Sequence, residues 1–468
     1  MRSAPEAGVV CVLLVVANLA TAQVTRSADL GARVDVAVRE AMARTAVPSA
    51  SVGIVQAGRI VFTRAFGKAR LEGPVAANVN MRYAVGSISK QFTAACILLL
   101  HEEGKLSLDD SVGKYLPELT RAGDVTLRRL LSHTSGYRDY APQDYTIPAW
   151  TTPRTALEIV HQWATEPLDF DPGTRYEYSN TNFKIAGLIV ERVSGEPFWS
   201  FLSRRVLGPL GMTHTIDLDA DRQALEPVGY RRNALGPLRP AIVEAPGWNF
   251  ADGELAMPVA DLLAWDISLM NQSLLAPASY TAMETEARLT NGDSAHYGLG
   301  VSLSTLDGHR AVSHDGEVGG FVASNAVYPD DKIAVAVLTN QEAGPAADTI
   351  TRALSILLLG ASRTTDEAAR AEVQAKAVLG DLQLGRINRT LFTADGNFYF
   401  DQVALDDYRT SLGPLGPVRS VRQISTYLRG GLTFRSFDVT FTNGPKLRLT
   451  AFTTADGKFE QFLVGPSG

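Results

Sequence analysis

Cysteine and histidine are both scarce in this chain. Two cysteines, Cys11 and Cys96, cannot build a disulfide scaffold or a four-thiolate metal site. The seven histidines are scattered, and no H-E-x-x-H motif brings two of them onto one face of a helix. We therefore expect a protein that uses no metal and no cofactor.

An excess of one charge is also missing. The chain has 44 Lys and Arg residues against 50 Asp and Glu residues, a net charge of −6. Such a chain has no overall attraction for nucleic acid, which we do not expect as a partner. The 468 residues are 45% hydrophobic and 20% charged, which is typical of a globular protein with about two or three domains.

No apolar run reaches the about 20 residues that a membrane-spanning helix needs. The run at residues 8–17 follows Arg2 and ends before Ala20-Thr21-Ala22, a small-x-small pattern. We predict that residues 1–22 are a signal peptide, with an uncleaved anchor as the alternative. The mature chain would then have one cysteine and no transmembrane segment, which suits an exported protein of the bacterial periplasm.

Strand patterns occur early and late in the first 362 residues, with helices between them and at both ends. Residues 28–45 and 345–360 read as helices, residues 51–65 as a hairpin, and residues 309–313, 321–328 and 333–339 as strands. The stretch 84–290 is mostly helix and loop. We predict an α+β domain over residues 23–362, an antiparallel sheet flanked by terminal helices with a helical insert.

The composition shifts to small and charged residues around 361–372, where we place a domain boundary. Residues 365–468 are predicted to form a small α+β domain whose role the sequence does not reveal. Its predicted elements are a helix over 366–384 and strands over 390–400, 424–428, 432–441, 446–452 and 458–464.

The first chemical motif is Gly-Ser-Ile-Ser-Lys at residues 86–90, which opens an apolar helical pattern. A helix that starts near Ser87 puts Ser87 and Lys90 on one face, one turn apart. An amine at that distance can take the hydroxyl proton of a nucleophilic serine. Alternatively, Ser87 is a helix cap and Lys90 a solvated lysine.

The second motif is Tyr-Glu-Tyr-Ser-Asn at residues 176–180, before another helical pattern. A tyrosine beside a lysine would have a lowered pKa and could carry protons to and from Ser87. The structural alternatives are a packed Tyr178 and an Asn180 that caps the helix.

The third motif is His-Asp-Gly-Glu at residues 314–317, at the end of a candidate strand and before the late hairpin. The backbone N–H of Glu317, with that of Ser87, could form an oxyanion hole.

Ser-x-x-Lys, Tyr-x-Asn and His-x-Gly, in this order and at wide separation, resemble the penicillin-recognising serine hydrolases, on the class C β-lactamase side of that family. The resemblance covers about residues 30–360. It implies that Ser87 is acylated, that Lys90 assists its deprotonation, that Tyr178 is the general base and acid, and that Asn180 contacts the substrate amide.

The resemblance also implies that His314 belongs to the catalytic group and that Gly316 lines the substrate site with Glu317 in the oxyanion hole. No metal takes part. His133, in a segment that also resembles the family, is expected to order a loop.

One departure bears on the substrate. β-Lactamases and many DD-peptidases carry Lys-Thr-Gly where this chain has His314-Asp315-Gly316. Histidine is mostly neutral near pH 7, so a substrate carboxylate is less favoured there. Members with His-x-Gly resemble esterases, including the family VIII type, and D-amino-acid peptidases or amidases.

We therefore expect a serine hydrolase that acts on an ester or a D-residue amide or peptide. The alternatives are a true β-lactamase or DD-carboxypeptidase, and a binding protein on the same scaffold that does not turn over. The expected partner is a small-molecule or peptide substrate, and the sequence does not reveal the oligomeric state.

Overall fold

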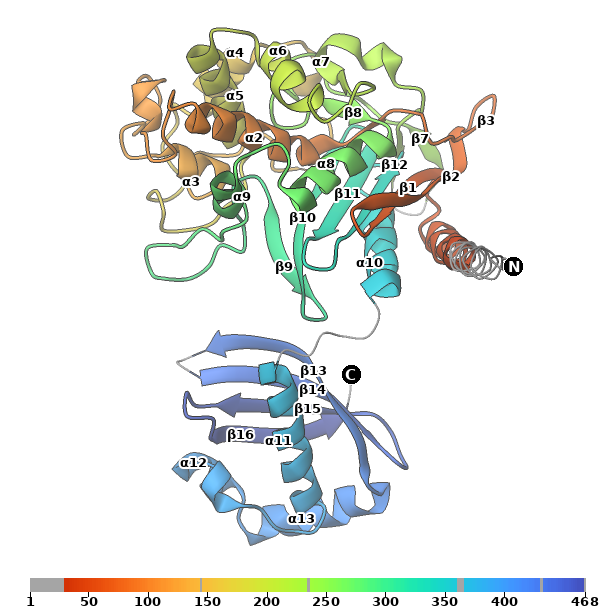
Figure 1. Ribbon diagram of the computed structural model, residues 1–468, viewed down its shortest axis with the longest axis vertical. Coiled ribbons are helices and arrows are strands. Elements are labelled where there is room, and N and C mark those ends of the chain that lie inside the picture. Colours follow the sequence, from red (N-terminus) through yellow and green to blue (C-terminus); the bar gives the residue numbers. More distant parts are fainter. Residues whose placement is uncertain (1–28, 144, 234–235, 360–365, 430–431, 467–468) are drawn as a thin grey trace, which may run out of the picture. The chain divides into compact units, whose positions relative to one another are not determined.

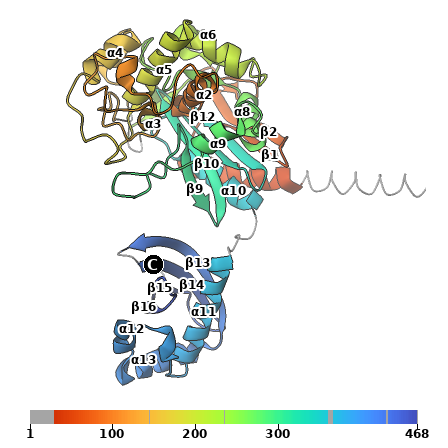
Figure 2. The same ribbon diagram turned by 60° about the vertical axis from the view of Figure 1, so that its left-hand side comes forward.

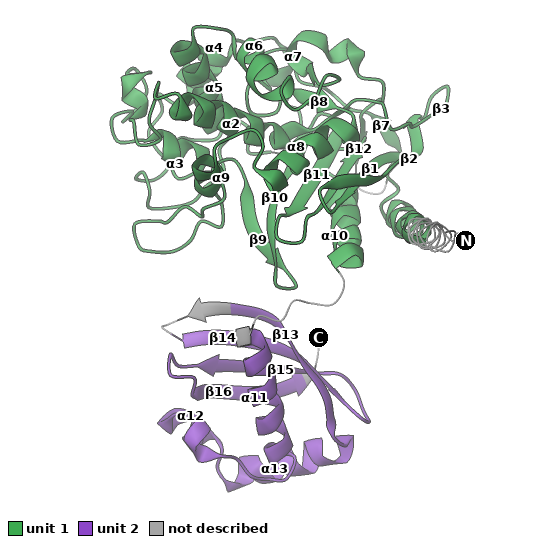
Figure 3. Ribbon diagram, in the orientation of Figure 1, with its two compact units in different colours: residues 1–360 green, residues 361–468 purple. Residues whose placement is uncertain are grey.

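The computed structural model describes residues 29–143, 145–233, 236–359, 366–429 and 432–466, so the predicted signal peptide lies outside the described residues. The chain divides into two compact units, residues 1–360 and 361–468 (Figure 3). Each unit has its own hydrophobic core.

A seven-stranded antiparallel sheet forms the centre of the first unit (Figure 1). Its order across the sheet is β3 (Val75–Ala76), β2 (Arg59–Arg70), β1 (Ser49–Gln56), β12 (Ile333–Thr339), β11 (Phe321–Tyr328), β10 (His309–Val318) and β9 (Ser302–Leu306). The early hairpin β1–β2 therefore joins the late strands through the β1–β12 pair.

The buried strands of this sheet carry apolar side chains on both faces, and helices cover each face. On β12, Val335 and Val337 pack in the core shared with helix 29–45 and α10 (Ala346–Leu359). The alternate residues of β12 pack in the core shared with α8 (Val259–Asn271) and α2 (Ser89–Glu102). The positions of these helices relative to the sheet can be followed in Figures 1 and 2. The predicted α+β class, with terminal helices and a helical insert, is confirmed.

The insert carries helices and short strands between α2 and β9. Besides α8, its α-helices are α3 (Leu127–Leu131), α4 (Ala156–Trp163), α5 (Asn180–Ser194), α6 (Phe198–Leu202), α7 (Leu218–Asp221) and α9 (Pro277–Met283). Its short strands are β5 (Ile216–Asp217), β6 (Tyr230–Arg232), β7 (Leu238–Pro240) and β8 (Leu255–Met257). A further short strand, β4 (Tyr83–Ala84), precedes α2. Among the described helices, none is both long and apolar enough to cross a membrane.

The second unit packs helices against a four-stranded antiparallel sheet. The strands are β13 (Val418–Arg429), β14 (Leu432–Phe441), β15 (Leu447–Thr453) and β16 (Phe459–Pro466). The helices are α11 (Asp366–Leu382), α12 (Ala394–Tyr399) and α13 (Gln402–Leu412). Apolar residues of α11, such as Leu379, share a core with Phe437 and Leu449 of the sheet.

The strand predicted over 390–400 is wrong, because this stretch forms a 3₁₀ turn (Arg389–Leu391) and then α12. The Thr393 side chain accepts a hydrogen bond from the Gly396 N–H at 3.1 Å, which caps the start of α12. Asp401 caps the unpredicted helix α13 in the same way through the Ala404 N–H.

Candidate active site

Ser87 lies in the 3₁₀ turn η1 (Gly86–Ile88), and Lys90 lies in the first turn of α2, which begins at Ser89. The α-helix itself thus starts two residues after the predicted position, although the two side chains still meet. Lys90 Nζ donates to Ser87 Oγ at 2.8 Å. The lysine is 0% exposed, so it is not the solvated side chain of the structural alternative.

Lys90 has two further hydrogen-bond acceptors, Asn180 Oδ1 at 2.7 Å and the Asp252 carbonyl oxygen at 2.9 Å. Burial lowers the pKa of Lys90 to about 8, although the carboxylates of Asp252 and Asp139 act in the opposite direction. When the ammonium loses a proton, the two acceptors keep the remaining N–H groups. The lone pair of the neutral amine then faces Ser87, whose hydroxyl can donate to it.

Asn180 is the first residue of α5, and the helix cap is Ser179. The Asn180 backbone N–H donates to Asp139 Oδ1 at 2.9 Å, and the Asn180 side-chain Nδ2 donates to Asp139 Oδ2 at 3.3 Å. Asp139 therefore fixes the orientation of the Asn180 amide, so that the amide oxygen points at Lys90.

Tyr178 contacts both members of the Ser-Lys pair. Its ring centroid lies 5.0 Å from Lys90 Nζ, and its hydroxyl is hydrogen-bonded to Ser87. Burial raises the pKa of Tyr178 well above its usual value, and the hydrogen bond to Ser87 opposes this only in part. The predicted lowering of this pKa is wrong, because desolvation and the carboxylates of Asp252 and Asp139 outweigh the hydrogen bond to Ser87, and the phenol stays protonated at neutral pH.

His133 supports the loop that carries Tyr178. The two ring centroids are 4.2 Å apart, and the Ser179 N–H donates to His133 Nδ1 at 3.1 Å. Burial keeps the pKa of His133 well below its usual value, so the ring is neutral.

The third motif lies at the end of β10 (His309–Val318), as predicted, although the strand continues through the motif instead of stopping at Ser313. Strand β9 pairs with β10 only as far as Ser313, so the residues that follow have β11 on one side and η1 on the other. A Cβ atom on Gly316 would lie 1.9 Å from the Val85 carbonyl oxygen and 2.7 Å from the Ser87 nitrogen. One on Gly86 would lie 2.5 Å from the Glu317 nitrogen, so the two proposed oxyanion donors belong to segments in van der Waals contact.

His314 is held as a neutral ring with a defined tautomer. Nδ1 lies 2.5 Å from the Asp315 carbonyl oxygen, which can only accept, so Nδ1 carries the proton. Nε2 therefore accepts from the Tyr297 hydroxyl at 2.7 Å. Burial and the nearby Lys90 lower the pKa of His314 to about 3, so this side chain adds no positive charge to the site.

Two cavities open onto Ser87. The smaller, about 280 Å³, is lined by the aromatic rings of Tyr176, Tyr178 and Tyr297 together with residues 314–317. The larger, about 470 Å³, lies between the loop at 139–146, the segment 248–253 and the β10–β11 turn.

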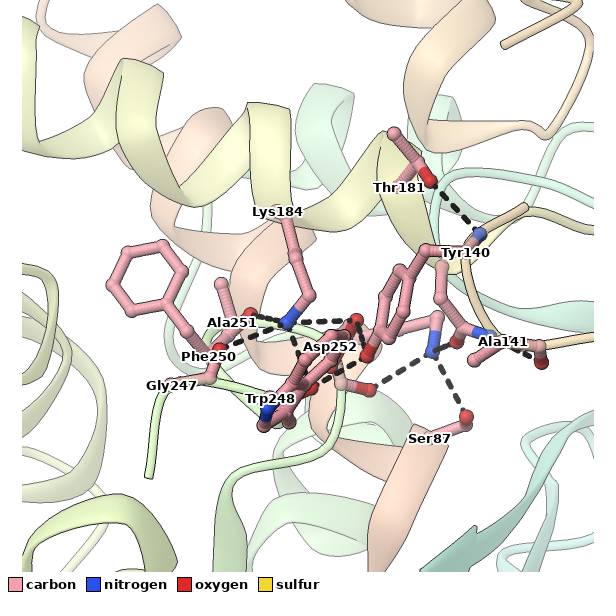
Figure 4. A network of polar contacts seen from close by, with 12 residues as sticks. Ser87, Tyr140, Ala141, Thr181, Lys184, Gly247, Trp248, Phe250, Ala251 and Asp252 are labelled. Carbon is pink, nitrogen blue, oxygen red and sulfur yellow. Dashed lines mark hydrogen bonds and ion pairs between the residues drawn. The ribbon is translucent and has the colours of Figure 1, made fainter. Parts of the chain in front are cut away.

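Sequence analysis missed Lys184, Tyr140 and Asp252, which form a buried network beside Ser87 (Figure 4). Lys184 Nζ lies 3.4 Å from an Asp252 carboxylate oxygen, and the Tyr140 hydroxyl is 2.9 Å from the same oxygen. One signal was available: Lys184 follows Asn180 by four residues, on the buried side of an apolar helix.

A serine hydrogen-bonded to a buried lysine and a protonated tyrosine, on an antiparallel sheet between helical layers, defines a serine hydrolase. The chain belongs to the beta-lactamase family, whose model matches residues 34–359.

Among its relatives, "Penicillin-binding protein 4*" of Bacillus subtilis is 27% identical over 424 residues, which cover 87% of this chain and 92% of that protein. A "D-aminopeptidase" of Gluconobacter oxydans is 28% identical over 67% of this chain and 60% of its own length. The solved D-stereospecific amidohydrolase from Streptomyces sp. has a TM-score of 0.59 and 27% identity, covering 68% of this chain and 96% of that one.

Proposed function

We propose that this protein hydrolyses an amide or peptide of a D-amino acid whose ammonium group is free, through an acyl-enzyme on Ser87. The observation that carries this proposal is the charge of the larger cavity. Six carboxylate residues line it: Asp139, Glu177, Glu244, Asp252, Glu317 and Glu342. Among its described lining residues there is no lysine or arginine.

Asp252 is ion-paired with Lys184 at 3.4 Å and Glu244 with Arg222 at 3.6 Å, and the remaining carboxylates leave the cavity wall with an excess of negative charge. Such a wall attracts the opposite sign of charge and repels its own. An ammonium group is therefore favoured beside Ser87, and a substrate carboxylate is disfavoured. The neutral His314 does not compensate, because its pKa of about 3 leaves it uncharged at neutral pH. β-Lactams and C-terminal D-peptides carry a carboxylate that this cavity would repel, which argues against the β-lactamase and DD-carboxypeptidase alternatives.

The hydrogen bonds of the site support a specific order of proton transfers. Neutral Lys90 takes the Ser87 proton as Oγ attacks the substrate carbonyl, and the N–H groups of Ser87 and Glu317 hold the oxyanion. The protonated Tyr178 hydroxyl donates to the leaving amine. The Lys90 ammonium, which has no hydrogen bond to Tyr178 but lies 5.0 Å from its ring centroid, then supplies the proton that Tyr178 has lost. Water attacks the ester in the second half of the reaction, with the same groups in reverse.

The names of two similar proteins agree with this substrate class: a D-aminopeptidase, of which the match covers 60%, and a D-stereospecific amidohydrolase. These names describe those two proteins. For this chain, the same substrate class is proposed because of the charge of the larger cavity.

The test is a matched panel of acyl donors. D-Alanine p-nitroanilide, its N-acetyl derivative, its L-enantiomer, a p-nitrophenyl ester and a penicillin are compared, with Ser87→Ala as the control. We expect the free D-amine to have the highest kcat/KM and its acetylation to lower this value by at least tenfold. Preference for the acetylated donor, or for the penicillin, would contradict the ammonium proposal.

We also propose export, with residues 1–22 removed and the hydrolase domain spanning residues 23–362. The apolar run after Arg2 and the bacterial relatives support this. N-terminal sequencing of protein from the periplasmic fraction should begin at Gln23, and an intact Met1 on a membrane-bound protein would contradict it.

A further inference from the structure

Three carboxylates form a cluster behind the wall of the active-site cavity. Asp217 ends β5, Asp219 lies in α7, and Glu254 immediately precedes β8. One carboxylate oxygen from each residue lies within 4.8 Å of those from the other two. No residue of this cluster has a part in the catalytic steps proposed above.

Glu254 is the unusual member. Its side chain is 2% exposed, and within the described part of the chain its Oε1 has no hydrogen-bond partner. Its carboxylate does accept a hydrogen bond from the Ala251 N–H, which leaves Oε1 as the atom without a partner. A buried carboxylate oxygen with no donor is costly unless a proton or a cation compensates it.

In the other two residues of the cluster, a carboxylate oxygen likewise accepts a hydrogen bond from a backbone N–H. Asp217 Oδ1 accepts from the Asp219 N–H at 2.8 Å. The Asp219 carboxylate accepts from the Gly247 N–H, while its Oδ1 is buried and has no partner among the described residues. Each carboxylate is thus oriented by the backbone through one of its oxygens.

The nearest lysine does not balance this charge. Lys184 is ion-paired with Asp252 at 3.4 Å and donates to the Trp248 carbonyl oxygen at 2.8 Å, as Figure 4 shows. Among the described residues, no lysine or arginine forms an ion pair with Asp217, Asp219 or Glu254.

We infer that Asp217, Asp219 and Glu254 bind one hard divalent cation, of the calcium or magnesium class. The donor set is made only of carboxylate oxygens, which these ions prefer and which disfavours zinc or copper. Water would complete the coordination.

The position gives the ion a structural role. Strands β5 and β8 pair through only two residues each, and a shared cation would join them. Glu254 is two residues from Asp252, whose carbonyl oxygen accepts from Lys90. Ala251, the residue before Asp252, has a φ of +61°, in the left-handed region that non-glycine residues rarely adopt. The ion would hold this strained segment against the active site without touching the reacting atoms.

The test uses the full chain, dialysed against a chelator and then titrated separately with CaCl₂, MgCl₂ and MnCl₂. Bound metal is measured by mass spectrometry of the equilibrated protein, and stability by thermal unfolding. We expect one bound ion per chain and a rise in Tm of about 5 °C at 100-fold excess over Kd, since an ion that binds only the folded state stabilises it.

Glu254→Gln and Asp219→Asn should lose both the bound ion and the Tm shift. Asp266→Asn is the matched control, because Asp266 is another fully buried carboxyl group outside the cluster, and it should keep both. If Glu254→Gln does not fold, Asp217→Asn at the half-exposed position replaces it. A wild type that binds none of the three ions, or cluster variants that bind as well as wild type, would overturn the inference, whatever the substrate panel shows.

Discussion

Lys90 is the residue whose protonation should control the rate. Its pKa of about 8 means that the neutral amine is a minority form at pH 6 and the majority form at pH 9. We expect kcat/KM for the N-acetylated anilide, which has no amine of its own to titrate, to rise with pH and to level off above about pH 8. A profile measured between pH 6 and 10 checks this.

Lys90→Arg keeps the charge but cannot deprotonate, and it should lower kcat/KM by about 10²–10⁴ and remove the pH limb. The exposed Lys114 supplies the control, since Lys114→Met should change neither kcat/KM nor its dependence on pH. If Lys90→Arg retained a normal pH profile, the base would have to be another group.

Tyr178 should matter more for amides than for activated esters. An amine leaving group needs a proton and p-nitrophenolate does not, and the raised pKa of Tyr178 keeps its proton available. Tyr178→Phe should therefore lower the turnover of the D-amino-acid anilide by about 10² and that of the p-nitrophenyl ester much less. Equal losses on both substrates would mean that Tyr178 acts before the leaving group departs.

Glu177 offers a local test of the ammonium preference, because it lines the larger cavity with an exposed side chain. An exposed charge pair contributes about 0.2–1 kcal/mol, so Glu177→Gln should raise KM for the free amine by about 1.4- to fivefold. The acetylated substrate should be unaffected. Glu166→Gln, on an exposed residue that is not among the cavity's lining residues, is the control.

At the scale of elements, the site depends on how closely β10 approaches η1. The Cβ atom of Gly316→Ala would meet the Val85 carbonyl oxygen at 1.9 Å and force the two segments apart. We expect kcat to fall by at least tenfold, because the oxyanion donors separate, together with a lower Tm. Gly123→Ala, where a Cβ meets nothing within 4 Å, should change neither quantity, and an active Gly316→Ala would contradict the tight approach.

Local signals identified most of the elements in the first unit. Alternating and helical patterns predicted β1, β2, β11, β12 and the terminal helices because those segments are apolar on their buried faces. The same rule failed at residues 390–400, where Phe392 and Phe400 pack in a core but the cap at Thr393 makes the chain helical. There a side-chain hydrogen bond to the backbone outweighed the pattern of apolar residues.

At the scale of the whole molecule, the described residues of the candidate site belong to the unit 1–360, whose core is separate from that of unit 361–468. A chain that ends at residue 360 should therefore fold and still form the acyl-enzyme. Intact-mass spectrometry with an acylating donor measures this, with Ser87→Ala as the control. Loss of acylation in a folded truncated protein would show that residues 361–468 contribute to the site.

The sequence by itself determined the fold class and named the residues proposed for catalysis, since Ser87 with Lys90, Tyr178 with Asn180, and His314 with Gly316 are local pairs at readable spacings. Tertiary structure decided the protonation states, because these depend on desolvation and on partners far away in sequence. It alone gave the neutral His314 its partner Tyr297 and raised the pKa of Tyr178. It also gathered the acidic cavity wall from six separate positions between residues 139 and 342, which no local pattern connects.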